Sequence, residues 1–179
     1  MCIRDSLTDA EGKVIKRTSS KLSLNSGEKK SIRQQMDVRN PKLWSPDAPY
    51  LYRVQSRIKK GNRSIDGGTT RIGIRLAEFR GKEGFWLNGK PFGQLVGANR
   101  HQDFAYVGNA LPNSQQWRDA KRLRDAGCTI IRVAHYPQDP SFMDACDELG
   151  MFVIVATPGW QYWNCLLYTS DAADDLTRV

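Results

Sequence analysis

Short segments of alternating hydrophobic and polar residues fill the first half of the chain. The clearest segment is Tyr50–Ile58, in which every second residue at its start is apolar and the intervening residues are polar, as at Arg53, Gln55 and Arg57. Turn-forming clusters at 9–12, 25–30 and 59–62 separate these segments. The pattern predicts half-buried antiparallel strands, and its spacing is typical of an immunoglobulin-like β-sandwich over residues 7–78.

The second half of the chain has a different period. Residues 85–92 predict a hairpin around Asn88-Gly89, a pair that tolerates the positive φ angles of a tight turn. Apolar strands are predicted at 94–99, 129–134 and 151–156, with a helical pattern in each gap between them. The order β-α-β-α-β predicts the start of a parallel α/β domain over residues 84–164.

The two helices carry start and stop signals. Asn113, followed three residues later by Gln116, predicts a capped helix start, and Gly127 predicts its end. Asp139-Pro140 predicts the second start and Gly150 the second end. The apolar residues expected to face the core are Trp117, Ala120 and Leu123 in the first helix and Phe142, Ala145, Cys146 and Leu149 in the second.

Charge is unevenly distributed along the 179 residues. Residues 1–80 hold 18 Lys and Arg against 8 Asp and Glu, whereas the remainder holds 9 against 11. A basic half is compatible with nucleic-acid binding, but these charges alternate with apolar residues, which favours a solvated sheet face. We therefore expect no nucleic-acid partner. The sequence shows neither an apolar stretch of membrane-spanning length nor a signal-peptide pattern, so no membrane partner is expected, and the compartment stays open between periplasmic, secreted and cytoplasmic.

The histidines and cysteines are candidates for binding a metal or a substrate. No Cys/His spacing predicts a zinc site, and Cys128 and Cys146 are expected to be buried thiols. His101 and His135 each follow a predicted strand, so in a βαβ unit both lie at the carboxyl ends of neighbouring parallel strands, where α/β barrels handle substrate. A structural role for each histidine is the alternative. A metal site built from these histidines and Asp103 is disfavoured, because no spacing signature supports it.

Six motifs follow one another along the chain: NPKLWSPDAPYLY at 40–52, RIGIR at 71–75, FWLNGKPF at 85–92, GANRHQDF at 97–104, IRVAHYPQDPSFMDACDELG at 131–150 and PGWQYW at 158–163. Together they resemble family 2 glycoside hydrolases, the β-galactosidase and β-glucuronidase group. The resemblance implies an immunoglobulin-like sandwich followed by the first part of a TIM (β/α)8 barrel. Residues 1–6 and 166–179 fall outside it and resemble sequencing-adapter read-through, so we interpret them as non-native ends.

The resemblance also implies a function. Family members are retaining exo-glycosidases that release terminal β-linked sugars from oligo- or polysaccharides with two glutamates, an acid/base and a nucleophile. Both are expected beyond Val179, so this chain is predicted to hold no catalytic residue and to be inactive alone. We expect a carbohydrate substrate and no cofactor in this chain. The resemblance leaves a divalent or monovalent cation site and an oligomer open for the full-length protein.

The same resemblance assigns substrate-binding residues. His101 and His135 match two histidines that line the sugar pocket, Arg132 matches a position that can orient a catalytic carboxylate, and Trp160 is placed to stack on a sugar face. Asn99 and Asp103 are weaker candidates. A purely structural role is the alternative for each: an ion pair in the barrel wall for Arg132, a core aromatic for Trp160, a backbone contact for Asn99 and a loop cap for Asp103.

Two departures from the family pattern affect the interpretation. Gln102 stands where many members have Glu, and Ala156-Thr157 stands where many have Asp-Glu. The lost carboxylates would remove acceptors for sugar hydroxyls or a cation, so a substrate other than a simple β-galactoside is expected. They also motivate a competing hypothesis, a non-catalytic carbohydrate-binding or scaffold protein with a degenerate barrel.

Overall fold

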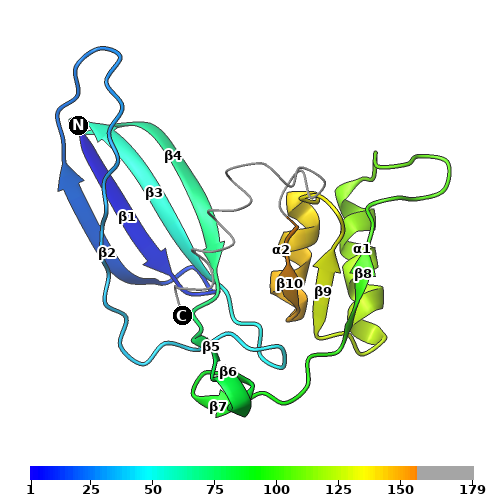
Figure 1. Cartoon of the computed structure of the whole chain (residues 1–179). Helices are drawn as coiled ribbons and strands as arrows, with labels where there is room; N and C mark the ends of the chain where they lie inside the picture. The colour runs from blue at the N-terminus through cyan, green and yellow to red at the C-terminus, as the bar shows by residue number, and fades with distance from the viewer. Residues whose placement is uncertain (157–179) are drawn as a thin grey trace, which may run out of the picture. The chain divides into compact units, whose positions relative to one another are not determined.

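The computed structural model describes residues 1–156 and divides into two compact units (Figure 1). The first unit comprises Met1–Trp44 and Tyr50–Ile74, and the second comprises Ser45–Pro49 and the chain from Arg75 onward. The sequence predicts an antiparallel β unit followed by the start of a parallel α/β unit. The structure confirms this order. The exact domain limits predicted above, 7–78 and 84–164, stay a prediction.

The first unit is built on a four-stranded antiparallel sheet in the order β2-β1-β3-β4. Its strands are β1 (Cys2–Thr8), β2 (Val14–Lys21), β3 (Tyr52–Lys60) and β4 (Arg63–Ile72). This is the one hydrogen-bonded sheet in the described part of the unit. The alternating segment predicted at 50–58 becomes β3, which begins two residues later with the buried Tyr52.

The core of the first unit lies on one side of this sheet. Leu7, Tyr52 and Trp44 are each at most 3% exposed. Trp44 lies against Gly73, where a β-carbon would come within 3.0 Å of the indole, and its backbone N–H donates to the Ile74 carbonyl over 2.8 Å. The segment before β3 therefore packs against the residues that follow β4 without forming a strand of its own.

The structure describes only one of the two ends that are suspected to be non-native. Residues 2–6 lie inside β1 and pair with both β2 and β3. Their proposed non-native origin is a matter of sequence and stays a prediction. Residues 166–179 lie outside the described residues.

The second unit begins with a small sheet of three strands, β5 (Ala77–Phe79), β6 (Phe85–Leu87) and β7 (Lys90–Pro91), with a 3-10 turn, η1 (Gly81–Glu83), between the first two. Asn88 and Gly89 connect β6 to β7 with φ angles of 53° and 77°. These positive angles are what a tight primed turn requires, so the predicted hairpin is confirmed.

A parallel sheet in the order β10-β9-β8 forms the rest of the unit. Its strands are β8 (Gly97–Arg100), β9 (Ile130–Val133) and β10 (Phe152–Ile154), and the helices α1 (Asn113–Asp125) and α2 (Pro140–Leu149) connect them (Figure 1). The predicted β-α-β-α-β order is confirmed, although each strand is shorter than its apolar run suggests.

The start of α1 differs from the prediction. Asn113 is the first helical residue and caps nothing; Pro112 precedes it, and the Pro112 carbonyl accepts the backbone N–H groups of Gln115 and Gln116. Trp117, expected in the core, is 43% exposed, and its indole N–H donates to Glu148 of α2 over 3.3 Å. The hydrogen bond to α2 keeps this indole at the outer edge of the helix pair.

The boundaries of α2 are confirmed. The Asp139 carboxylate accepts the Ser141 backbone N–H over 2.7 Å, and Pro140 occupies the first turn. Gly150 ends the helix in the left-handed conformation with φ 75°, and its N–H bonds to the Cys146 carbonyl. These are the two ends at which the sequence carries the strongest capping chemistry.

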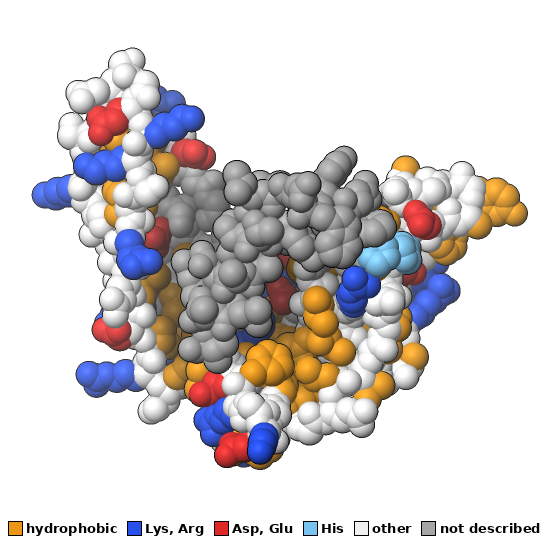
Figure 2. Space-filling view, viewed as in Figure 1, with side chains coloured by type: hydrophobic (Ala, Val, Ile, Leu, Met, Phe, Trp, Pro, Cys, Tyr) orange, Lys and Arg blue, Asp and Glu red, His pale blue; other side chains and the backbone are white. Residues whose placement is uncertain are grey.

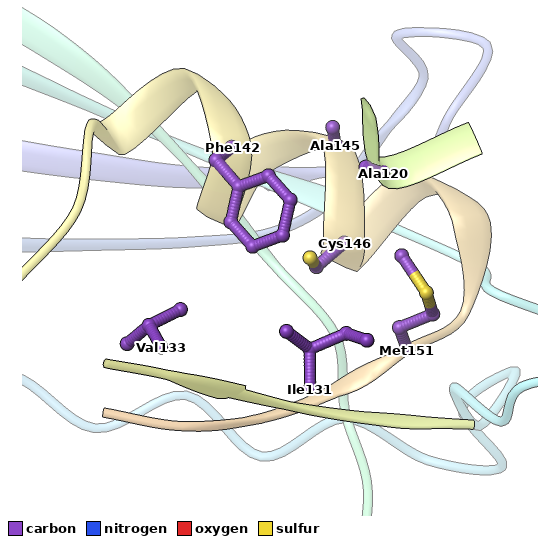
Figure 3. Close-up of a cluster of buried hydrophobic side chains, with 7 residues drawn as sticks. All are labelled: Ala120, Ile131, Val133, Phe142, Ala145, Cys146 and Met151. Carbon is purple, nitrogen blue, oxygen red and sulfur yellow. The ribbon is translucent and has the colours of Figure 1, made fainter. Parts of the chain in front are cut away.

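The core of the second unit lies between the helices and the parallel sheet. Figure 3 shows Phe142 and Cys146 of α2 facing Ile131 and Val133 of β9, whereas Ala145 of α2 lies on the side of Ala120. Ala120 of α1 and Met151 complete this cluster, and every member is at most 2% exposed. Cys128, predicted to be buried, is only half-buried, because β9 begins two residues after it.

Burial raises the pKa of the Cys146 thiol from 9.0 to about 12, Asp147 raises it further, and Arg100 opposes the shift. The unfolded chain therefore loses this proton first as pH rises. Stability tied to the neutral thiol is fully present below pH 9 and is lost between pH 9 and about 12.

Cys146→Ala removes this pH dependence. Raising the pH from 8 to 10.5 should lower the free energy of urea unfolding by about 2 kcal/mol more in the unmodified chain than in the variant. Equal losses in the two proteins would contradict the assignment of a buried neutral thiol.

Gly150 and Gly127 form a matched pair for a second prediction. Both follow a helix with positive φ, but a β-carbon at Gly150 would overlap the backbone of Pro46, whereas one at Gly127 meets nothing within 4 Å. Gly127→Ala should cost about 1 kcal/mol for the left-handed backbone alone. Gly150→Ala should cost at least about 1 kcal/mol more because of the overlap. Urea unfolding measures both, and equal losses would show that the Pro46 contact contributes nothing.

Candidate substrate-binding site

The three parallel strands of the second unit end at one edge of their sheet. His101 directly follows β8, and His135 follows β9 by two residues. Both side chains are exposed, their ring centroids are 5.5 Å apart, and the rings meet edge to face at 77°. The approach of the two histidines expected from the βαβ order is confirmed. Figure 2 shows histidine side chains, in pale blue, at the molecular surface beside a blue cationic side chain.

The sheet face turned away from the helices carries a polar row beneath this edge. Asn99 on β8 and Arg132 on β9 occupy equivalent positions and form this polar row. The apolar Ile154 occupies the equivalent position on β10. All three residues line an open cavity of about 400 Å³. Neither the Asn99 side chain nor the Arg132 side chain makes a hydrogen bond or ion pair within residues 1–156, so the row offers an amide and a cation to the cavity.

Aromatic rings pack against the start of β10 at the opposite end of the strands. Phe152 contacts Phe85 of β6 at 5.3 Å and Phe92 at 5.6 Å between ring centroids, and those two rings contact each other at 5.6 Å. Phe152 and Ile130 are paired across β10 and β9, one layer below the polar row. The hairpin thus supplies an apolar floor, and polar groups gather toward the carboxyl edge.

The remaining predicted site residues are not drawn into this row. Asp103 lies in the loop after β8, where its carboxylate accepts the side-chain amide of Asn109. That contact matches the loop-capping alternative. Trp160 lies outside the described residues. The sugar-binding roles of all six residues stay predictions.

Gln102 ties the loop after β8 to the loop after β9. Its side-chain oxygen accepts the Asp139 backbone N–H over 2.7 Å, and its own backbone N–H donates to the Tyr136 hydroxyl over 3.0 Å. The side chain is therefore engaged by the loop after β9. Its amide oxygen does not stand in for a carboxylate that faces substrate.

Arg100 is a buried residue at this edge that sequence reasoning missed. Its side chain is 6% exposed and lies on the opposite side of β8 from Asn99. It donates to Gln116 over 2.8 Å, to Asp119 over 2.9 Å and to Gln138 over 2.5 Å. One signal was available: the strand alternation that sends Asn99 to the open face sends its neighbour Arg100 toward the helices.

No group of three or more His, Cys, Asp or Glu side chains in residues 1–156 is arranged to hold a metal ion. In the same range, no helix is both long enough and apolar enough to cross a membrane.

Parallel strands that alternate with helices and gather polar side chains at their carboxyl edge are the arrangement found in TIM-barrel enzymes. Two family models match the sequence: "Glycosyl hydrolases family 2" over residues 2–75 and "Glycosyl hydrolases family 2, TIM barrel domain" over residues 78–169. The chain belongs to family 2 of the glycosyl hydrolases.

Known proteins of this family are similar to the chain over most of its length. A beta-galactosidase of Thermoanaerobacter pseudethanolicus is 46% identical over 134 residues, which is 74% of this chain and 18% of the relative. A putative beta-glucuronidase of Formosa agariphila is 36% identical over 151 residues, or 84% of this chain and 18% of the relative. The chain thus spans about a fifth of the length of these curated relatives.

Solved structures agree with these matches. A family 2 glycosyl hydrolase from Bacteroides cellulosilyticus superposes with a TM-score of 0.83 at 31% identity and covers 95% of this chain and 24% of that protein. A beta-glucuronidase from Bacteroides uniformis gives a TM-score of 0.80 at 33% identity, with 88% of this chain and 19% of that protein covered.

Proposed function

We propose that this chain supplies one wall of the sugar-binding site of a retaining exo-glycosidase, similar to β-galactosidases, that releases terminal β-linked sugars. The observation that carries the proposal is the pair of exposed imidazoles 5.5 Å apart above the polar row of the sheet. An imidazole both donates and accepts hydrogen bonds, and a pyranose offers a ring of hydroxyls that need both. Two such rings at this spacing can each bond a different hydroxyl of one sugar.

Arg132 supports the same function from the row below. Its guanidinium lines the cavity and has no partner within residues 1–156. A fixed planar cation is suited to orient a carboxylate and keep it ionised. In the proposed enzyme, one glutamate attacks the anomeric carbon as the other protonates the leaving oxygen. Water, deprotonated by the second glutamate, then releases the sugar. Arg132 positions the first glutamate.

The three other predicted residues have lesser roles in this proposal. Asn99, beside Arg132 in the cavity, offers an amide to a hydroxyl. Trp160 stacks on a sugar face. Asp103 stabilises the loop after β8 through its contact with Asn109.

A non-catalytic carbohydrate-binding protein is the second candidate, motivated by Ala156, two residues after the third parallel strand, where many members have a carboxylate. It keeps the histidine pair and the fold but performs no hydrolysis. Sugar binding without turnover is the outcome that distinguishes it from the glycosidase.

A chimeric enzyme tests the proposal. The host is the beta-galactosidase of T. pseudethanolicus, with the segment aligned to this chain replaced by this chain's own sequence. The chimera should hydrolyse p-nitrophenyl β-galactoside. His135→Ala should lower kcat/KM by on the order of a hundredfold, because hydrogen bonds to sugar hydroxyls strengthen in the transition state. The thermal transition should not move, since His135 is exposed.

Arg118→Met is the matched control, because Arg118 is exposed on α1 with no partner within residues 1–156, and it should retain full activity. A folded His135→Ala protein with less than a threefold loss of kcat/KM would contradict the proposal. A folded chimera that binds galactose without hydrolysing the substrate would favour the non-catalytic alternative.

A further inference from the structure

We propose that Gln138 is a positioning residue: acting through Arg100, it holds the loop that carries His135 against the end of β8, so that His135 keeps its place beside His101. The inference rests on the proposed function, because it gives the histidine pair a reason to be held. Gln138 itself is nearly buried, at 9% exposed, and belongs to the loop between β9 and α2.

Both ends of the Gln138 carboxamide bond to one residue. Its oxygen accepts from Nη1 of Arg100 over 2.5 Å, and its nitrogen donates to the Arg100 backbone carbonyl over 2.6 Å. This pairing fixes the orientation of the amide group. A side chain of similar size without these two polar atoms would fill the space and lose the attachment.

Arg100 is a rigid anchor for this attachment. Its Nη2 donates to Gln116 and to Asp119, both on α1, and its guanidinium carbon lies 4.0 Å from the ring centroid of Phe142 on α2. The side chain is thus fixed to both helices. A residue that bonds to Arg100 is therefore held in place relative to both helices.

The loop after β9 is tied on both sides of His135 to residues on both sides of His101. The Ala134 N–H donates to the Arg100 carbonyl over 3.0 Å, so that carbonyl accepts from two residues of the loop. Gln102 adds the contacts to Tyr136 and Asp139 described above. These bonds join the loop after β9 to the end of β8 and to the loop that follows it.

A group that bonds to a transition state increases the rate only when it lies at the right place. A displacement of about 1 Å in a binding group can cost on the order of a hundredfold in rate. Loss of the Gln138 attachment leaves the loop held only by the Ala134 N–H and by the contacts with Gln102, while α2 and β9 stay packed. The imidazole of His135 then remains in the protein but no longer keeps its spacing from His101.

The test uses the chimera and a double-mutant cycle. Gln138→Leu should lower kcat/KM by about tenfold to a hundredfold in a protein that still melts cooperatively. In the His135→Ala background the same substitution should change kcat/KM by less than threefold, because its effect passes through His135. Arg118→Met is the control in both backgrounds and should change neither.

A second variant covers the case in which Gln138→Leu fails to fold. Gln138→Glu keeps an acceptor for the Arg100 guanidinium but loses the donor to the Arg100 carbonyl, and the same non-additivity with His135→Ala is expected. Additive losses in the cycle would reduce Gln138 to a structural residue and overturn the inference, while the proposed function stands. A crystal structure of the variant with the two imidazoles still 5.5 Å apart would overturn it too.

The proposed function fails in a different way. If His135→Ala alone leaves kcat/KM unchanged, the histidine pair does not serve the reaction, and this positioning role falls with it. Because the single and double variants are measured separately, the two failures are distinguishable.

Discussion

The buried guanidinium of Arg100 is the contact that joins the separate parts of the α/β unit. A cation that is 6% exposed has lost most of its water, and such a group is tolerated only when charge and hydrogen bonds replace the solvent. Asp119 supplies the charge at 2.9 Å, and Gln116 and Gln138 supply carbonyl oxygens. One side chain thereby links β8 to α1 and to the loop after β9. The Nε atom of Arg100 has no partner within residues 1–156, so the other nitrogens make all of these bonds.

Alternation along the parallel strands separates stability from chemistry. Ile131 and Val133 face the helices and are completely buried, whereas Arg132 between them faces the open cavity. On β8 the same alternation gives Arg100 to the core and Asn99 to the cavity. A substitution on the helix side therefore changes folding first, and one on the open side changes binding first. Gln138 is informative because it is buried in the loop that carries His135 and bonds to Arg100, which faces the helices.

Local signals in the sequence were sufficient for part of this structure. The Asn88-Gly89 turn, the Asp139 cap and the Gly150 terminus were predicted correctly, because each depends on backbone chemistry within a few residues. The approach of His101 and His135 was also predictable, because strand order and strand spacing require it.

Other features depend on contacts between distant residues, and there the predictions were wrong or missing. Gln116 was expected in a capping motif, but its side chain is buried against Arg100, 16 positions away. Gln102 was noted only as a replacement for a carboxylate, and nothing in the sequence predicted its bond to Asp139, 37 positions away. Side-chain type does not reveal such a partner, since an amide serves equally well at a surface, a cap or a buried network. The roles proposed for the site residues rest on the resemblance and on geometry together.

A crystal structure of the chimera with galactose bound tests the central claim most directly. The account predicts that the imidazoles of His101 and His135 each lie within about 3.2 Å of a different hydroxyl of the same sugar ring. Arg132 should lie beneath that ring, on the open face of the sheet. A sugar bound in the barrel with neither histidine within hydrogen-bond distance would contradict the account.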